Sequence, residues 1–84
     1  MSAYGARVYK QDGFAMARTR APKITWGKTL RESMLRTQNK VTVVGAKRPG
    51  QDVLYAVPEL VIEADDELIV SGRINHVDAF CRLR

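Results

Sequence analysis

The fold of this chain is decided by the stretch Gly27-Lys28-Thr29-Leu30-Arg31-Glu32-Ser33-Met34-Leu35-Arg36-Thr37-Gln38-Asn39-Lys40-Val41-Thr42-Val43-Val44-Gly45-Ala46-Lys47-Arg48. Thr29 and Glu32 form a capping box, in which the hydroxyl accepts from a helical amide and the carboxylate accepts from the cap amide. Leu30 and Met34 then share one helical face. The stretch therefore begins with a short amphipathic helix.

The same stretch ends in the most apolar strand of the chain. Residues 41–46 are apolar on both faces apart from Thr42, which is typical of a central strand buried on both sides. Asn39, just before this strand, suits the left-handed conformation in which helices often end. Such a strand must pair with neighbours that the rest of the chain supplies.

Turn signals divide the remainder into further strands and a last helix. Residues 6–10 and 14–20 flank Gln11-Asp12-Gly13, a hairpin signal, and Pro49-Gly50 suits a type II turn. The other predicted elements are strands at 52–57, 60–63 and 67–71 and a helix that Asn75 opens, with an apolar stripe of Val77, Phe80, Cys81 and Leu83. We predict an α+β fold: a small, mostly antiparallel sheet with two helices.

Length and composition indicate one small domain. The chain has 84 residues, and we assign 1–13 to an N-terminal arm and hairpin and 14–84 to the core. A domain of this size buries a limited core, so we expect a two-fold symmetric homodimer. One cysteine and no apolar run of about 18 residues favour a cytoplasmic protein.

The charge is unevenly distributed. Fourteen Lys and Arg face nine Asp and Glu, which gives a net charge of +5, and most of the excess lies in the first half of the chain. This pattern is typical either of a surface for an anionic partner or of an ordinary solvated face. Composition alone leaves both interpretations open.

No combination of residues indicates catalysis or a metal site. Gly27-Lys28-Thr29 lacks the upstream glycine of a phosphate-binding loop, because Pro22 stands there. His76 and Cys81, the only residues of their kinds, are five positions apart and do not share a helix face. The acidic run Glu63, Asp65, Asp66 and Glu67 is interpreted as a solvated turn. We assign no catalytic residue and no metal ligand, and we expect a protein that is not an enzyme.

Nucleic-acid binding is the alternative from another class. The basic half, together with Tyr4, Tyr9, Phe14, Trp26 and Tyr55, could form a stacking platform. However, no RNP-like run, GxxG clamp or zinc framework is present. Trp26 also lies near Ile24 and Leu30 in the sequence, which favours a place in the core. We therefore expect no nucleic-acid partner.

An ordered set of motifs points to a family. These are Gly27-Lys28-Thr29-Leu30-Arg31-Glu32, the apolar strand with Gly45-Ala46-Lys47-Arg48 at its end, Pro58, and Asp66-Glu67-Leu68-Ile69-Val70-Ser71-Gly72 before a short helix. Over residues 14–84 the chain resembles the C-terminal lobe of RCK proteins, the TrkA-C domain. Asn39 and Asp65 stand where that family usually has glycine, and no nucleotide-binding Rossmann lobe precedes the motifs.

The resemblance implies a function and a site. It implies a dimeric regulatory module of a membrane potassium channel, a potassium transporter or a cation/proton antiporter, held at the inner face of the membrane by that partner. In relatives that sense cyclic di-AMP, the nucleotide lies between two protomers. The positions that match its binding residues here are Leu30, Arg31, Arg36, Thr42, Val43 and Pro58.

The leading hypothesis is therefore a cytoplasmic regulatory domain that takes cyclic di-AMP as its regulatory ligand and needs no other cofactor. Arg36 would contact a phosphate, since a guanidinium can donate two parallel hydrogen bonds. Leu30, Val43 and Pro58 would form an apolar bed for adenine. The alternative within the same transport system is a dimerisation module without a ligand.

Overall fold

The protein is built on one antiparallel sheet. The computed structural model describes residues 5–84, with side chains from residue 10 onward. The first four residues of the predicted arm and the side chains of Tyr4 and Tyr9 lie outside this described part. The strands are β1 (Gly5–Gln11), β2 (Phe14–Arg20), β3 (Thr42–Lys47), β4 (Leu54–Tyr55) and β5 (Glu67–Arg73), in the order β1-β2-β5-β3-β4. All the neighbouring pairs are antiparallel.

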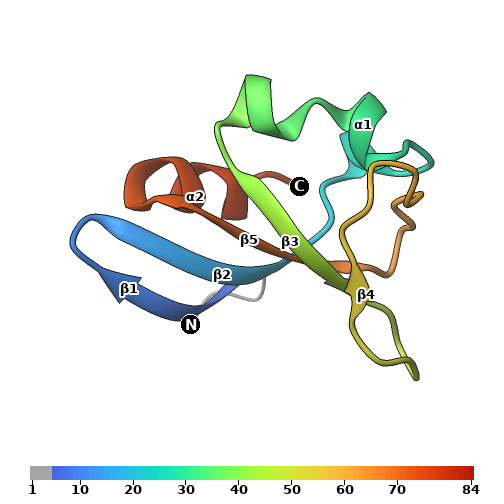
Figure 1. Cartoon of the computed structure of the whole chain (residues 1–84), viewed down its shortest axis with the longest axis horizontal. Coiled ribbons are helices and arrows are strands. Elements are labelled where there is room, and N and C mark those ends of the chain that lie inside the picture. The colour runs from blue at the N-terminus through green and yellow to red at the C-terminus, as the bar shows by residue number, and fades with distance from the viewer. Residues whose placement is uncertain (1–4) are drawn as a thin grey trace.

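Four short helical elements complete the fold. They are the 3₁₀ turn η1 (Lys23–Thr25), helix α1 (Leu30–Ser33), the π-helical turn η2 (Leu35–Asn39) and helix α2 (Ile74–Cys81). Helix α2 packs on β2 and β5, while η2 contacts β3, and Figure 1 shows both on the same side of the sheet. The predicted α+β architecture with two α-helices is confirmed.

The predicted hairpin at the start of the chain is also confirmed. Strands β1 and β2 pair from Gly5 opposite Thr19 to Gln11 opposite Phe14. The turn residues Asp12 and Gly13 both have positive φ, 55° and 80°. Two positive φ values in a two-residue loop make a type I′ turn, whose twist matches that of the strands.

Alternation along β2 shows which face of the sheet is the core. Ala15, Ala17 and Thr19 are buried, whereas the residues between them are at least partly exposed. Their small size lets α2 approach closely, and its buried residues Val77 and Phe80 face the inner side. The core therefore lies between one face of the sheet and α2.

The central strand is β5, and the prediction that residues 41–46 form a strand buried on both sides is wrong. β5 pairs with β2 on one side and β3 on the other. β3 is exposed at Thr42 and Val44, because its neighbour β4 is only two residues long and its outer face is uncovered. An apolar run indicates a strand, but it does not say where in the sheet that strand lies.

Helix α2 begins without the predicted cap. Asn75 lies inside the helix, and the position before Ile74 is held by Arg73, whose side chain makes no capping hydrogen bond. The Ile74 amide instead donates to the Gly13 carbonyl oxygen at 2.9 Å. The hairpin turn therefore performs the role that a polar side chain plays at other helix starts.

The chain between β3 and β5 contains less regular structure than predicted. The strand expected at 52–57 shrinks to β4, and the strand expected at 60–63 is a single bridge between Val61 and Thr29. Pro58 has no amide proton for a ladder, which limits pairing here. The predicted turn at Pro49-Gly50 is present, with Gly50 at φ 75° and the Gln51 amide donating to the Arg48 carbonyl oxygen at 3.1 Å.

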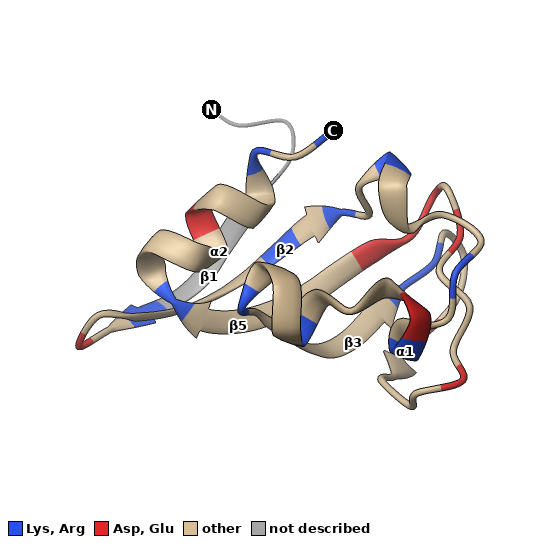
Figure 2. Ribbon diagram, turned by 90° about the horizontal axis from the view of Figure 1, so that it is seen from above, with Lys and Arg blue, Asp and Glu red and all other residues tan. Residues whose placement is uncertain are grey.

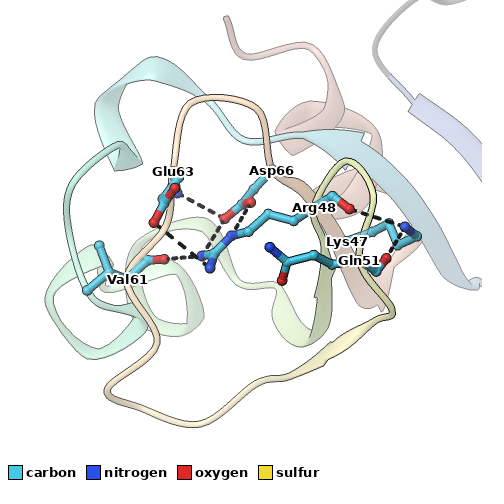
Figure 3. A network of polar contacts seen from close by, with 6 residues as sticks. All are labelled: Lys47, Arg48, Gln51, Val61, Glu63 and Asp66. Carbon is cyan, nitrogen blue, oxygen red and sulfur yellow. Dashed lines mark hydrogen bonds and ion pairs between the residues drawn. The ribbon is translucent and has the colours of Figure 1, made fainter.

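A buried ion pair holds this irregular segment (Figure 3). The Arg48 guanidinium donates from Nε to Asp66 Oδ1 at 2.8 Å and from one Nη to Asp66 Oδ2 at 3.1 Å and to the Val61 carbonyl oxygen at 2.7 Å. The Glu63 amide also donates to Asp66 Oδ2, at 2.9 Å. The Asp66 hydrogen bond raises the pKa of Arg48 above its ordinary value. The interpretation of the acidic run as a solvated turn is therefore wrong for Asp66, whose side chain is fully buried.

We predict that Arg48→Met destabilises the fold by about 3–5 kcal/mol, because it leaves the Asp66 carboxylate buried without a cation. Urea unfolding measures the change. Glu63→Gln is the matched control, since the Glu63 carboxylate lies 3.9 Å from Arg48 and is 62% exposed. The control should change stability by less than about 1 kcal/mol. Equal effects of the two substitutions would contradict the assignment of the buried pair as the stabilising contact.

Candidate functional site

The predicted capping box exists and sets the position of α1. The Glu32 amide donates to Thr29 Oγ1 at 3.1 Å, and the Thr29 amide donates to Glu32 Oε1 at 2.9 Å. The hydrogen bonds from Thr29 lower the pKa of Glu32 below its ordinary value of 4.5, because they favour the ionised carboxylate.

Backbone hydrogen bonds fix α1 to the irregular segment. The Leu30 amide donates to the Leu60 carbonyl oxygen at 2.9 Å, and the Arg31 amide donates to the Pro58 carbonyl oxygen at 3.1 Å. The position of α1 thus depends on the same loop that Arg48 and Asp66 hold. These bonds also satisfy amides at the helix start that have no partner within α1.

Two residues with left-handed backbone bracket the turn that carries Arg36. Met34 has φ 57° and Lys40 has φ 61°. The prediction that Asn39 adopts this conformation is wrong by one residue. Asn39 is the last residue of η2, and the left-handed residue is Lys40, which follows it. The reversal at Met34 turns Leu35 into the core and leaves Arg36 exposed. Left-handed backbone in a residue other than glycine costs about 1–2 kcal/mol, and the buried Leu35 side chain offsets it.

A β-bulge shapes the strand that faces this turn. The register between β3 and β5 shifts between Val43 and Gly45, which leaves Val44 unpaired and exposed. A Cβ at Gly45 would lie 3.1 Å from a Val53 methyl group and 3.2 Å from the Leu54 carbonyl oxygen, so a side chain there would crowd β4. The bulge therefore changes the direction of β3 beside η2.

These elements enclose a cleft of about 270 Å³. Its lining residues come from α1, η2, β3 and the residues just before β3 and just after β4, and they are Leu30, Ser33, Leu35, Arg36, Val41, Thr42, Val43 and Ala56. Four of the predicted site residues thus lie together, namely Leu30, Arg36, Thr42 and Val43.

Arg31 and Pro58 are not among the residues that line the cleft. The Arg31 guanidinium donates to Glu59 Oε2 at 3.1 Å, with both side chains 69% exposed. Pro58 is joined to Arg31 by the backbone hydrogen bond described above. Sequence reasoning missed Ser33, Leu35, Val41 and Ala56. No residue type at positions 34–36 predicts the chain reversal at Met34, and Ala56 follows a strand too short to predict.

The chemistry of the cleft suits a ligand with apolar and anionic parts. Among the described residues, Arg36 is the only charged residue that lines the cleft, and none of them is an acidic partner of Arg36. The Ser33 hydroxyl donates to the Leu30 carbonyl oxygen at 2.6 Å, so its oxygen can still accept a hydrogen bond. Thr42 is exposed and can donate or accept. Within residues 10–84, no group of three His, Cys, Asp or Glu residues could hold a metal ion.

Comparison with known proteins identifies the family. The model of the TrkA-C domain matches residues 22–84. The chain belongs to the TrkA-C family. This is the C-terminal RCK domain family, whose members are regulatory domains and not enzymes. A search of curated proteins finds no match. No helix of the described chain has the length and apolar character required to span a bilayer.

Solved structures share the fold. The GsuK RCK domain has a TM-score of 0.73 at 21% identity over 95% of this chain, and the GsuK channel bound to NAD has 0.72 at 28% over 81%. The RCK C domain of the potassium transport protein KtrA, solved in complex with cyclic diadenosine monophosphate, has 0.71 at 21% over 82%. This chain spans 18% and 13% of the two GsuK chains and 81% of the KtrA domain.

We predict that Lys40→Gly stabilises the TrkA-C domain by about 0.5–1 kcal/mol, because glycine adopts positive φ without steric cost. Lys40→Ala is the control, since it removes the same exposed side chain but keeps a Cβ. Chemical unfolding should show a gain for the glycine variant alone. A similar gain for both variants would mean that the lysine charge, and not the backbone, is responsible.

The capping box predicts a pH dependence. Because the folded pKa of Glu32 is lowered from 4.5, ionised Glu32 contributes stability that is present above that unfolded value and lost as the pH falls through the folded pKa. Glu32→Gln keeps a capping oxygen but cannot ionise. The stability difference between wild type and this variant should be present at pH 7 and shrink as the pH falls below 4.5. A difference that persists in acid would argue against the ionised cap.

Proposed function

We propose that this chain is a cytoplasmic ligand-sensing regulatory domain of a potassium or other monovalent-cation channel or transporter. The ligand we propose is cyclic di-AMP, bound in the cleft of two facing protomers. Family membership supports the regulatory role, and the proteins that share the fold include the GsuK channel and the potassium transport protein KtrA. The observation that carries the ligand proposal is the cleft, which gathers apolar side chains around the single cation Arg36.

The size of the cleft favours a shared site. Small-molecule sites usually measure about 300–1,000 Å³. One cleft of about 270 Å³ is below that range and suits half of a dinucleotide. Two copies facing each other across a two-fold axis would present two arginines to a ligand that itself has two-fold symmetry and two phosphates.

Exposed apolar side chains around the cleft support a homodimer. Met34, Val44, Tyr55 and Val57 are 47%, 43%, 86% and 49% exposed, and each is the chain neighbour of a residue that lines the cleft. We call these four residues the rim, and exposed apolar side chains of this kind are candidates for an interaction surface. A second copy placed over the rim would bury these side chains and close the cleft around its ligand.

Regulation would follow if the two arrangements of the dimer bind the nucleotide with different affinities. If the closed arrangement of the dimer binds the nucleotide more tightly, the ligand shifts the population towards that arrangement. The attached transport protein would respond to the change, and the coupling cannot exceed the difference in ligand affinity between the two states. Without such a ligand the same surface would serve as a dimerisation module.

We predict that calorimetry gives one cyclic di-AMP per two chains. Arg36→Ala should weaken binding by about 2–4 kcal/mol, since each phosphate would lose a charge-assisted donor. Arg82→Ala is the matched control: Arg82 is exposed beyond the end of α2 and does not line the cleft, so its variant should bind as the wild type does.

Two results would contradict the proposal. A wild-type dimer that gives no heat would leave a dimerisation module without a ligand. Full affinity in the Arg36 variant would mean that the nucleotide binds outside this cleft. Sedimentation of the same samples separates dimer formation from nucleotide binding, because a monomer at about 10–100 µM would show that the dimer does not form.

A further inference from the structure

A second exposed apolar patch lies outside the cleft and its rim. Trp26 and Leu83, each 39% exposed, line a shallow hollow of about 230 Å³ together with Arg20, Ala21, Lys23 and Arg84. Ile24, next to Lys23, is 70% exposed. We call these seven residues the tryptophan patch. The prediction of a place in the core for Trp26 is wrong, because the residue is 39% exposed, whereas the preceding Thr25 is buried.

The fold holds the patch in place. The Trp26 indole Nε1 donates to the Ala21 carbonyl oxygen at 2.8 Å, which fixes the ring. The Lys23 amide donates to the Arg84 carbonyl oxygen at 3.1 Å, so the end of the chain lies against η1. Thr25 Oγ1 donates to the Pro22 carbonyl oxygen at 2.6 Å inside the turn. The exposure of Ile24 and Trp26 therefore belongs to an ordered turn.

The patch is basic. None of the described residues that line its hollow is acidic, whereas Arg20, Lys23 and Arg84 are cationic. Figure 2 shows Lys and Arg at the end of β2 and at the C-terminal end of the chain. A neighbouring hollow shares Arg20 and adds Arg18, Lys47 and Arg48, but it also contains Asp65 and Glu67, and Glu67 pairs with Arg18. The apolar side chains of the tryptophan patch are thus bordered by cations, and none of the described residues that line this hollow is acidic.

We propose that the tryptophan patch docks on an anionic phospholipid surface. Tryptophan is enriched at membrane–water interfaces, where its ring lies at the level of the lipid headgroups. Lysine and arginine next to such a ring are attracted by anionic headgroups. Ile24 supplies an apolar side chain that enters the interface and is otherwise left in water.

Two other occupants fit less well. A hollow of about 230 Å³ is below the usual range for a small-molecule site, about 300–1,000 Å³. A second copy joined through this patch would bring the cations of both patches into one interface, where none of the described lining residues is acidic, and like-charge repulsion disfavours this. A lipid surface needs neither a deep pocket nor a matching protein shape. Docking of the tryptophan patch on lipid would also bring the domain to the membrane independently of the proposed nucleotide cleft.

The single tryptophan makes the proposal directly measurable. Titration with phosphatidylcholine vesicles that contain phosphatidylglycerol should shift Trp26 emission to the blue, and vesicles of phosphatidylcholine alone should not. Salt at about 1 M, where the Debye length is about 3 Å, should abolish the shift. Removing one basic residue near an anionic surface weakens binding about fivefold, so Lys23→Gln should show that loss. Ile24→Ser should weaken binding about tenfold through lost apolar burial.

A matched control separates the patch from the net charge. Lys10 pairs with Ala15 at the opposite end of β2 from Arg20, about 15–20 Å away along the strand, which exceeds the Debye length in physiological salt. Lys10→Gln removes the same charge as Lys23→Gln and should change vesicle binding less than about twofold. Circular dichroism should show that every variant is folded.

Defined outcomes would overturn the proposal. These are no blue shift with anionic vesicles, an equal shift with uncharged vesicles, or equal losses in the Lys10 and Lys23 variants. A shift produced by a soluble glutamate-rich peptide but not by vesicles would replace the lipid with an acidic protein partner. Arg36→Ala should bind vesicles normally and Lys23→Gln should bind cyclic di-AMP normally, so failure of one proposal is distinguishable from failure of the other.

Discussion

A single buried carboxylate organises one end of this domain. The Asp66 side chain accepts from the Arg48 guanidinium and from the Glu63 amide, and its backbone carbonyl oxygen accepts from the Ala21 amide at 2.9 Å. The residue therefore joins the exits of β2 and β3 to the entry of β5. A carboxylate without solvent contact is unfavourable by itself, so all these contacts must form together. The segment between β3 and β5 has little regular structure, and α1 is fixed to that segment, so the shape of the cleft depends on the same contacts.

Local sequence signals were sufficient for features that depend on neighbouring residues. The hairpin turn at Asp12-Gly13, the capping box of Thr29 and Glu32 and the turn at Pro49-Gly50 are all present. In each case the determinant is a property of two to four adjacent residues, such as a φ value or a side chain within reach of a backbone amide. The ordered set of motifs was also enough to predict the family and the antiparallel α+β fold.

Features that depend on distant residues were not predictable in the same way. Asp66 resembles any residue of an acidic turn until the fold brings Arg48 to it. Asn75 has the composition of a cap, but Gly13, far away in the chain, supplies the acceptor for the helix start. Of the predicted site residues, Leu30, Arg36, Thr42 and Val43 line one cleft, whereas Arg31 is engaged with Glu59. The family pattern places backbone positions well, but it does not specify the neighbours of each side chain.

The strand order has a consequence for how the protein is made. β5, at the centre of the sheet, comes late in the sequence, and it pairs Phe14 with Arg73 and Thr42 with Ser71. The first hairpin can form while the chain is emerging, but β2 and β3 have no partner between them until residues 67–73 have emerged. Pairings of such long sequence separation are slow to form, and unpaired strand edges are prone to aggregate in the interval. The nascent domain therefore exposes two open strand edges until residues 67–73 have been synthesised.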